Sequence, residues 1–205
     1  MAILVEIIIM TKVHCDGCGD GVPSYDITHY GAIDGSYRDL CNRCFSAEVA
    51  KVCGVDNIDY ARLEPIGITD CDGVSHQFHF TTRLLGHIVT LDAFELKDGQ
   101  QTGYKFQIIG DPEEDQFALL GRMIGRIRKT LSVKYIKDNG DGYGFQIIDM
   151  MVRGRFERDL SLLDAYMPSV VVDGQEISWE KFGRMISSYE GWQFKLEILD
   201  RSDEL

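Results

Sequence analysis

Alternating apolar and polar residues mark a run of strands in the middle of the chain. The segments 76–83 (HQFHFTTR), 87–96 (HIVTLDAFEL) and 104–110 (YKFQIIG) each show this two-residue period, and Leu85 and Gly86 lie at the expected turn between the first two. Successive side chains of a strand point to opposite faces of a sheet, so each segment has one face for a core. The pattern predicts a largely antiparallel sheet.

The periodicity then changes to that of a helix. Between residues 111 and 137 the apolar side chains recur every three or four residues and define one stripe, formed by Phe117, Leu120, Ile124, Ile127 and Leu131. Asp111 and Pro112 favour a helix start just before it. In the next segment, 138–144 (DNGDGYG), glycines at the third and fifth positions favour a turn over a calcium-binding loop.

Strands and helices are also expected in the last third of the chain. Residues 144–158 predict one long strand with Ile148, Met150 and Val152 on one face, and residues 160–166 predict a short helical piece. Residues 169–178 (SVVVDGQEIS) predict a hairpin whose turn is formed by the Asp-Gly pair in the middle.

Ser178 is a favourable N-cap for a helix that we expect to stop at Gly191. Residues 192–199 (WQFKLEIL) again alternate and predict a closing strand. Strands in hairpins with helices between them indicate an α+β domain with two main helices.

Two Cys-x-x-Cys pairs lie 22 residues apart near the N-terminus. Zinc requires four donors at tetrahedral corners, and each such turn supplies two thiolates from one tight reversal of the backbone. A rubredoxin-type iron site is the alternative, but the second pair, CNRCF, lacks the Pro and Gly expected of it. Doubled spacing of this kind argues against four unrelated buried thiols. We predict a zinc ion bound by Cys15, Cys18, Cys41 and Cys44.

The segments around these pairs follow a definite order. Strands are expected at 25–31 and 36–40, joined by a turn at Asp34 and Gly35, and the helical segment after Cys44 should end at Gly54. A first Cys-x-x-Cys turn is thus followed by a hairpin and by a second pair at the start of a helix. This order resembles the treble-clef zinc finger over residues 13–54. Treble clefs occur in nucleases, ribosomal proteins and protein-binding adaptors, so the resemblance implies a fold and no single function.

The predicted metal site is closed, because thiolates fill all four positions and leave none for water. A metal in such a site folds its segment and does not catalyse. Between residues 10 and 60 only four basic side chains accompany eight carboxylates, which makes this module a poor phosphate binder. Cys53 and Cys71 should be dispensable for the metal. A second cluster of Cys71, His76 and His79 is disfavoured, because strand alternation sends the two histidines to opposite faces.

Composition places the chain among soluble proteins of the reduced cytoplasm. It has 205 residues, 44% of them hydrophobic and 26% charged, which is enough for one or two domains with a real core. The 33 acidic and 21 basic residues give a net charge of −12, so nucleic acid is the less favoured partner. Cysteines paired at metal-ligand spacing favour a reduced compartment over a secreted disulfide framework.

No membrane contact is expected from the sequence. The chain contains no apolar run long enough to span a bilayer. The opening MAILVEIIIM has no basic segment and no small-residue cleavage site, so a signal peptide is disfavoured. Its β-branched residues predict a strand over residues 1–9, unless translation starts at Met10.

One basic region stands out against the acidic composition. Six basic and no acidic residues lie between Phe117 and Lys137, and a second basic cluster follows on the predicted strand 153–158. Either these side chains form a solvated surface balanced by nearby carboxylates, or they dock an acidic partner or a nucleic acid. We define the candidate docking patch as Arg122, Arg126, Lys129, Arg153, Arg155 and Arg158.

Residues 170–198 (VVVDGQEISWEKFGRMISSYEGWQFKLEI) resemble the end of a bacterial protein family of unknown function, in which a cysteine-paired segment precedes an α+β domain. The resemblance implies a bacterial origin and two parts, here residues 1–60 with the zinc module and residues 72–205 with the α+β domain. No nucleophile elbow, phosphate loop, dinucleotide fingerprint or zincin helix is present. The expected function is a zinc-stabilised interaction or regulatory protein that binds a protein partner. Nucleic-acid binding through helix 122–137 and strand 153–158, or an enzyme of unrecognised type, are the alternatives.

Overall fold

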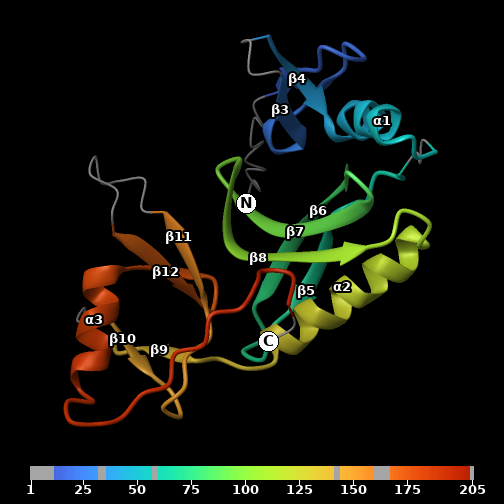
Figure 1. Cartoon of the computed structure of the whole chain (residues 1–205). Helices are drawn as coiled ribbons and strands as arrows, with labels where there is room; N and C mark the ends of the chain where they lie inside the picture. Colours follow the sequence, from blue (N-terminus) through green and yellow to red (C-terminus); the bar gives the residue numbers. More distant parts are fainter. Residues whose placement is uncertain (1–11, 32–35, 57–59, 141–143, 159–166, 204–205) are drawn as a thin grey trace, which may run out of the picture. The chain divides into compact units, whose positions relative to one another are not determined.

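A computed structural model describes residues 12–31, 36–56, 60–140, 144–158 and 167–203 (Figure 1). Over these residues the chain is mixed α+β, as predicted, with three α-helices and several small antiparallel sheets. It divides into two compact units. Unit 1 comprises Met1–Gly67, Gln77–Arg126 and Arg201–Leu205, and unit 2 comprises Ile68–His76 and Ile127–Asp200. The strand expected over residues 1–9 lies outside the described residues.

Unit 1 begins with the cysteine-rich module. Strand β1 (Lys12–His14) pairs with β2 (Gly21–Pro23), and a 3-10 turn η1 (Ser24–Asp26) leads into a hairpin of β3 (Ile27–Gly31) and β4 (Tyr37–Cys41). Helix α1 (Asn42–Cys53) follows β4 directly, and Gly54 ends it in the left-handed conformation, with φ 66°. The predicted hairpin and helix are confirmed. The turn expected at Asp34 and Gly35 lies outside the described residues.

A four-stranded antiparallel sheet follows, with strand order β5-β6-β7-β8. Its strands are β5 (Ile66–Thr69), β6 (Ser75–Leu85), β7 (Ile88–Lys97) and β8 (Gln100–Gly110). The turn between β7 and β8 is formed by Asp98 and Gly99, which both have positive φ. Strand β8 begins four residues earlier than the alternation predicts. Its pairing with β7 continues past an irregularity, where the register shifts between Phe94 and Glu95.

The part of this sheet that lies in unit 1 is covered on both faces. The six residues from Val89 to Phe94 are all buried. Tyr25 of the cysteine module packs edge-on against Phe94 and His79, with ring centroids 5.3 and 5.7 Å away, while Gln116 donates to Thr82 on the opposite face. The module and helix α2 therefore pack against opposite faces.

Helix α2 (Gln116–Leu131) lies alongside β8 (Figure 1). Of the predicted apolar stripe, Ile127 and Leu131 are buried and Leu120 and Ile124 are half-buried, so only Phe117 was placed wrongly. Phe117 is 67% exposed, and the fully buried row consists of Leu119, Met123, Ile127 and Leu131. Leu119 reaches Gly110 of β8, where a Cβ would lie 2.9 Å from the leucine Cδ1. The position of β8, which lies outside the helix sequence, decides which residues of α2 are buried.

Unit 2 is built around a second, smaller core. Strands β11 (Arg155–Arg158), β12 (Pro168–Val172) and β13 (Gln175–Ser178) form an antiparallel sheet, and α3 (Trp179–Ser187) follows it. Asp173 and Gly174 form the predicted hairpin turn with positive φ, and Ser178 accepts from the Lys181 amide as the predicted N-cap. The core is formed by Ile136, Val170, Val172, Ile177 and Met185.

Two predicted strands of unit 2 are corrected. The long strand 144–158 is broken into β10 (Phe145–Ile147), which pairs with β9 (Ile136–Asp138), and the separate β11. Asp149 and Met150 have φ values of 53° and 55° between them, and a left-handed residue cannot continue an extended ladder. The helix expected at 160–166 lies outside the described residues.

The closing strand predicted at 192–199 belongs to no sheet among the described residues. Helix α3 ends at Ser187, and the chain turns through Gly191, with φ 83°, before this segment. Alternation in a sequence shows that a segment suits a sheet, but a strand also needs a neighbouring edge. We call residues 192–199 the closing segment.

Candidate metal centre

Three different elements bring the four predicted cysteines together. Cys15 and Cys18 lie in the tight turn between β1 and β2, Cys41 is the last residue of β4, and Cys44 lies in the first turn of α1. The four Sγ atoms all lie within 4.8 Å of one another. Cys15 and Cys41 are buried, Cys44 is half-buried and Cys18 is exposed. The hairpin β3-β4 thus brings Cys41 and Cys44 next to Cys15 and Cys18.

Backbone hydrogen bonds fix the first turn in place. The Gly19 amide donates to the Cys15 carbonyl at 2.8 Å, and the Asp16 amide donates to the Asp39 carbonyl at 2.8 Å. In return, the Asp39 amide donates to the Asp16 carboxylate at 2.7 Å. Gly19 has φ 79°, which other residues rarely adopt. The first Cys-x-x-Cys turn is therefore fixed to β4 by backbone hydrogen bonds as well as by the cysteine cluster.

Backbone amides also point at the sulfur of Cys15. The amides of Gly17 and Cys41 donate to its Sγ at 3.3 and 3.2 Å. Burial acts to raise the pKa of this thiol, but the amides of Cys41, Cys18 and Gly17 outweigh it and lower the pKa to about 6. For Cys44 burial dominates, and together with the neighbouring thiols it raises the pKa. Cys15 is therefore disposed to carry charge at neutral pH, which a metal ligand requires.

The remaining cysteines and histidines are not part of this cluster. Among the described residues, these four cysteines are the only group of three or more metal-ligating side chains whose ligand atoms lie this close together, within 4.8 Å of one another. Cys53 is half-buried near the end of α1 and Cys71 is exposed. His76 contacts the Asp70 carboxylate at 3.2 Å, and His79 stacks on Phe94. Both histidines are thus engaged in ordinary structural contacts.

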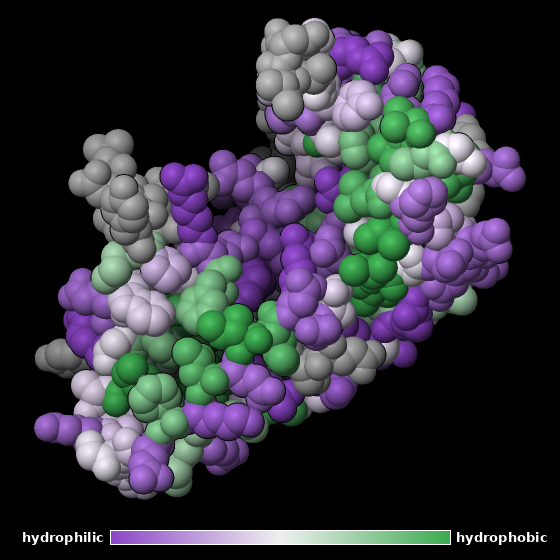
Figure 2. Space-filling view, viewed as in Figure 1, coloured by the Kyte–Doolittle hydropathy of each residue, from purple (hydrophilic) through white to green (hydrophobic). Residues whose placement is uncertain are grey.

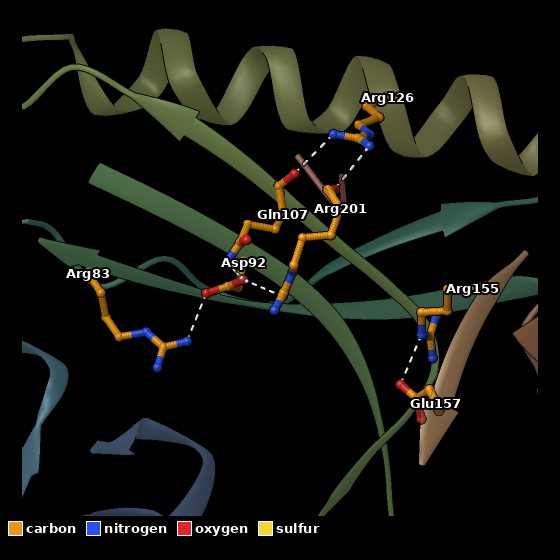
Figure 3. Close-up of polar contacts among 7 residues, drawn as sticks. All are labelled: Arg83, Asp92, Gln107, Arg126, Arg155, Glu157 and Arg201. Carbon is orange, nitrogen blue, oxygen red and sulfur yellow. Dashed lines mark hydrogen bonds and ion pairs between the residues drawn. The ribbon is translucent and has the colours of Figure 1, made fainter. Parts of the chain in front are cut away.

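A polar cluster on the sheet of unit 1 was not predicted. Asp92 of β7 is 6% exposed, and its carboxylate accepts from Arg83 at 2.8 Å, from Gln107 at 2.8 Å and from Arg201 at 3.2 Å (Figure 3). A buried carboxylate needs such partners to offset its lost hydration. The alternation of β7 signals a buried position at Asp92, but nothing in the sequence identifies Arg201 as its partner.

The candidate docking patch is divided between structural and exposed side chains. Arg122 donates to the Ile109 carbonyl and to Glu114, and Arg155 donates to Glu157 at 2.9 Å. Arg126 binds the Gln107 carbonyl at 3.0 Å and the carbonyls of residues 201–203 (Figure 3). The other three members, Lys129, Arg153 and Arg158, are exposed. Their role in docking stays a prediction.

A cleft of about 610 Å³ lies beside the cysteine module in unit 1. It is lined by η1, the start of α1, residues 60–65 and the stretch 79–82 of β6. The titratable side chains that line it include Tyr25, Asp26 and His79. Burial raises the pKa of Tyr25 and of Asp26 and lowers the pKa of His79, so it favours the uncharged form of each.

Comparison with known families divides the chain into three domains. Residues 14–56 match a domain of unknown function (DUF7685), residues 59–132 match another (DUF7686), and residues 135–203 match a third (DUF7713). The first spans the four-cysteine module, and the third covers most of unit 2. No curated protein and no solved structure matches the chain. No helix in the described part of the chain is long and apolar enough to cross a membrane.

Proposed function

We propose that the four-cysteine module binds one structural zinc ion and that the protein acts in the cytoplasm by binding a protein partner. The donor set supports the metal. Sulfur ligands about 2.3 Å from a tetrahedral zinc lie about 3.8 Å apart. The Sγ atoms of Cys18 and Cys41 are 3.9 Å apart, far longer than a disulfide and suited to a shared ion.

The role of the ion follows from its ligands. Cys15, Cys18, Cys41 and Cys44 would complete the coordination, as in the treble-clef arrangement that the module resembles. The module has a core of only a few apolar side chains around Leu40 and Phe45, so metal binding would contribute much of its folding free energy. The zinc would thus hold β4 and α1 in position. It would have a structural role and no catalytic one.

The observation that carries the binding function is the closing segment of unit 2. Its large apolar side chains are exposed: Trp192 by 63%, Phe194 by 90%, Leu196 by 66% and Ile198 by 71%. Apolar side chains also gather on the visible face of unit 2 (Figure 2). Contiguous exposed apolar surface of this kind marks interaction sites in soluble proteins. A protein surface is the partner that would cover it.

Affinity capture with the full-length tagged chain tests this function. Phe194→Ser should abolish capture of a specific protein from the native host, because it removes the most exposed apolar side chain of the segment. Phe117→Ser is the matched control, since Phe117 is likewise an exposed phenylalanine, on α2. Equal capture by both variants and the parent chain would contradict the proposed binding surface.

The cleft beside the module supports a second candidate, an enzyme or small-molecule-binding protein. Asp26 accepts from the Asn42 side chain at 2.5 Å, and Tyr25 and His79 lie on the same cleft. Converging titratable groups with shifted pKa values occur at functional sites. A metabolite screen by thermal shift, comparing the parent chain with Asp26→Asn, tests this candidate. A ligand that stabilises the parent chain and not the variant would favour it over the interaction function.

A further inference from the structure

The closing segment has the alternating sequence of a strand, and in the described part of the chain no strand pairs with it. Within the described residues, no backbone hydrogen bond is formed by residues 193–199. Lys195 and Glu197 contact each other at 3.3 Å, with side chains 85% and 63% exposed, so they share one face of the segment. In an extended backbone, the apolar side chains at even positions share the other face. An unpaired edge with an apolar row is a template for pairing with another strand.

The sequence of the segment is complementary to itself when two copies run antiparallel. Registers that place the two apolar rows on a common face must pair even positions with even positions. Centring the pairing on Lys195 or on Glu197 sets that residue opposite its own like charge. Centring it on Leu196 sets Lys195 opposite Glu197 of the second copy, and Glu197 opposite Lys195 of the second copy. Opposite charges directly across a pair of strands are stabilising, and like charges are destabilising.

The same register also matches the apolar row. Leu196 then faces Leu196 of the second copy. Phe194 of each copy faces Ile198 of the other, which gives two such pairs. Aromatic side chains opposite β-branched ones are among the favourable cross-strand pairs. A two-stranded ribbon alone is only marginally stable. Unit 2 offers further exposed apolar surface for the contact, at Phe156, Trp179 and Ile186.

We infer that the protein forms a homodimer in which residues 193–199 of two chains pair antiparallel about Leu196. This inference rests on the proposed interaction function and names its partner as a second copy of the chain. It accounts together for the strand-like sequence, the unpaired backbone, the exposed apolar row and the placement of the two charges.

Charge exchange tests both the dimer and its register. Sedimentation equilibrium of the full-length, metal-loaded chain should show a monomer–dimer equilibrium. Lys195→Glu and Glu197→Lys should each raise the dissociation constant about tenfold or more, because each creates two like-charge contacts. The double variant Lys195→Glu, Glu197→Lys should restore the parent value. Lys97→Glu, an equal charge change at an exposed residue of β7 in unit 1, should leave it unchanged.

Other outcomes would overturn the inference in distinguishable ways. A chain that stays monomeric over a wide concentration range would exclude the second copy. If the chain stayed monomeric while Phe194→Ser abolished capture of a different protein, the interaction function would stand and the homodimer would fall. A dimer that the double variant fails to restore would exclude the Leu196-centred register. Because the two charged side chains are exposed, circular dichroism should show equal folding of all variants.

Discussion

A Cβ atom at Gly17 would lie 2.9 Å from both the Cβ and the Sγ of Cys44. This distance is shorter than real Cβ contacts allow, and Gly17 also donates to the Cys15 sulfur. The two turns of the metal centre therefore approach each other closely only because residue 17 has no side chain. The glycine belongs to the site although it supplies no ligand.

We expect Gly17→Ala to weaken zinc binding by about tenfold, as is common when a group that orients metal ligands is disturbed. Competition with a chromophoric chelator measures the change. Gly21→Ala is the matched control, because a Cβ there makes only ordinary contacts, at 3.7 Å from the Lys12 side chain. Equal affinity of the two variants would show that the turns can separate freely.

Cys53 and Cys71 should both be replaceable by serine without loss of metal. Neither belongs to the cluster of four sulfurs, which would by itself complete a tetrahedral site. Elemental analysis of the purified double variant should give the same zinc content as the parent chain, about one ion per chain. Loss of zinc from this variant, or its retention in Cys41→Ser, would refute the ligand assignment.

Metal removal should unfold the cysteine module before the rest of the chain. The predicted boundary between residues 60 and 72 implies that amide protection is lost before it and kept after it. Ser46 and Tyr25 nevertheless contact the sheet, the first by accepting from the Leu84 amide at 3.1 Å. Hydrogen exchange with and without a chelator decides the matter. Simultaneous loss of protection in β6 and β7 would mean that module and sheet fold as one core.

Asp70→Asn should lower the free energy of unfolding of unit 2 by about 3 kcal/mol at neutral pH. The Asp70 side chain is 1% exposed, and its carboxylate accepts from Lys134 at 2.6 Å and from the amides of Asp72 and Val74. Removing one partner of a buried ion pair leaves the other charge uncompensated. Both tryptophans, Trp179 and Trp192, lie in unit 2, so tryptophan fluorescence during urea unfolding reports on this unit.

The effect of Asp70 should depend on pH. Burial acts to raise the pKa of this carboxyl, but Lys134, the Val74 amide, His76 and the Asp72 amide hold it far below its usual range. A lowered folded-state pKa contributes stability above the unfolded-state value of about 4, and this stability is lost as the pH falls below that value. The parent chain and Asp70→Asn should therefore converge in stability on acidification. A constant difference down to strongly acidic pH would contradict the prediction.

Arg126→Met should release the chain segment 201–203 from unit 1. Its guanidinium donates to the carbonyls of Arg201, Ser202 and Asp203, and a methionine side chain cannot replace these hydrogen bonds. Limited proteolysis should cut the variant faster near its C-terminus. Arg128→Met, on the exposed side of the same helix, is the control and should be cut as the parent chain is.

Features governed by neighbouring residues were predictable from the sequence. The spacing of Cys15, Cys18, Cys41 and Cys44 predicted the cluster, because a Cys-x-x-Cys turn is a local structure and one hairpin suffices to join two of them. The Asp173-Gly174 turn followed from positive φ values that few residues adopt, and the Ser178 cap followed from a side-chain oxygen that accepts a backbone amide.

Features that depend on distant parts of the chain were decided by the tertiary structure. Packing against β8 decided which residues of α2 are buried, with Leu119 buried and Phe117 exposed. Arg126 binds the carbonyl of Ser202 only because the segment 201–203 returns to unit 1. The closing segment has the alternation of a strand, yet a strand exists only where another edge is available to bond its backbone. Sequence periodicity specifies which side chains share a face. The long-range packing that decides what each face meets is a property of the folded chain.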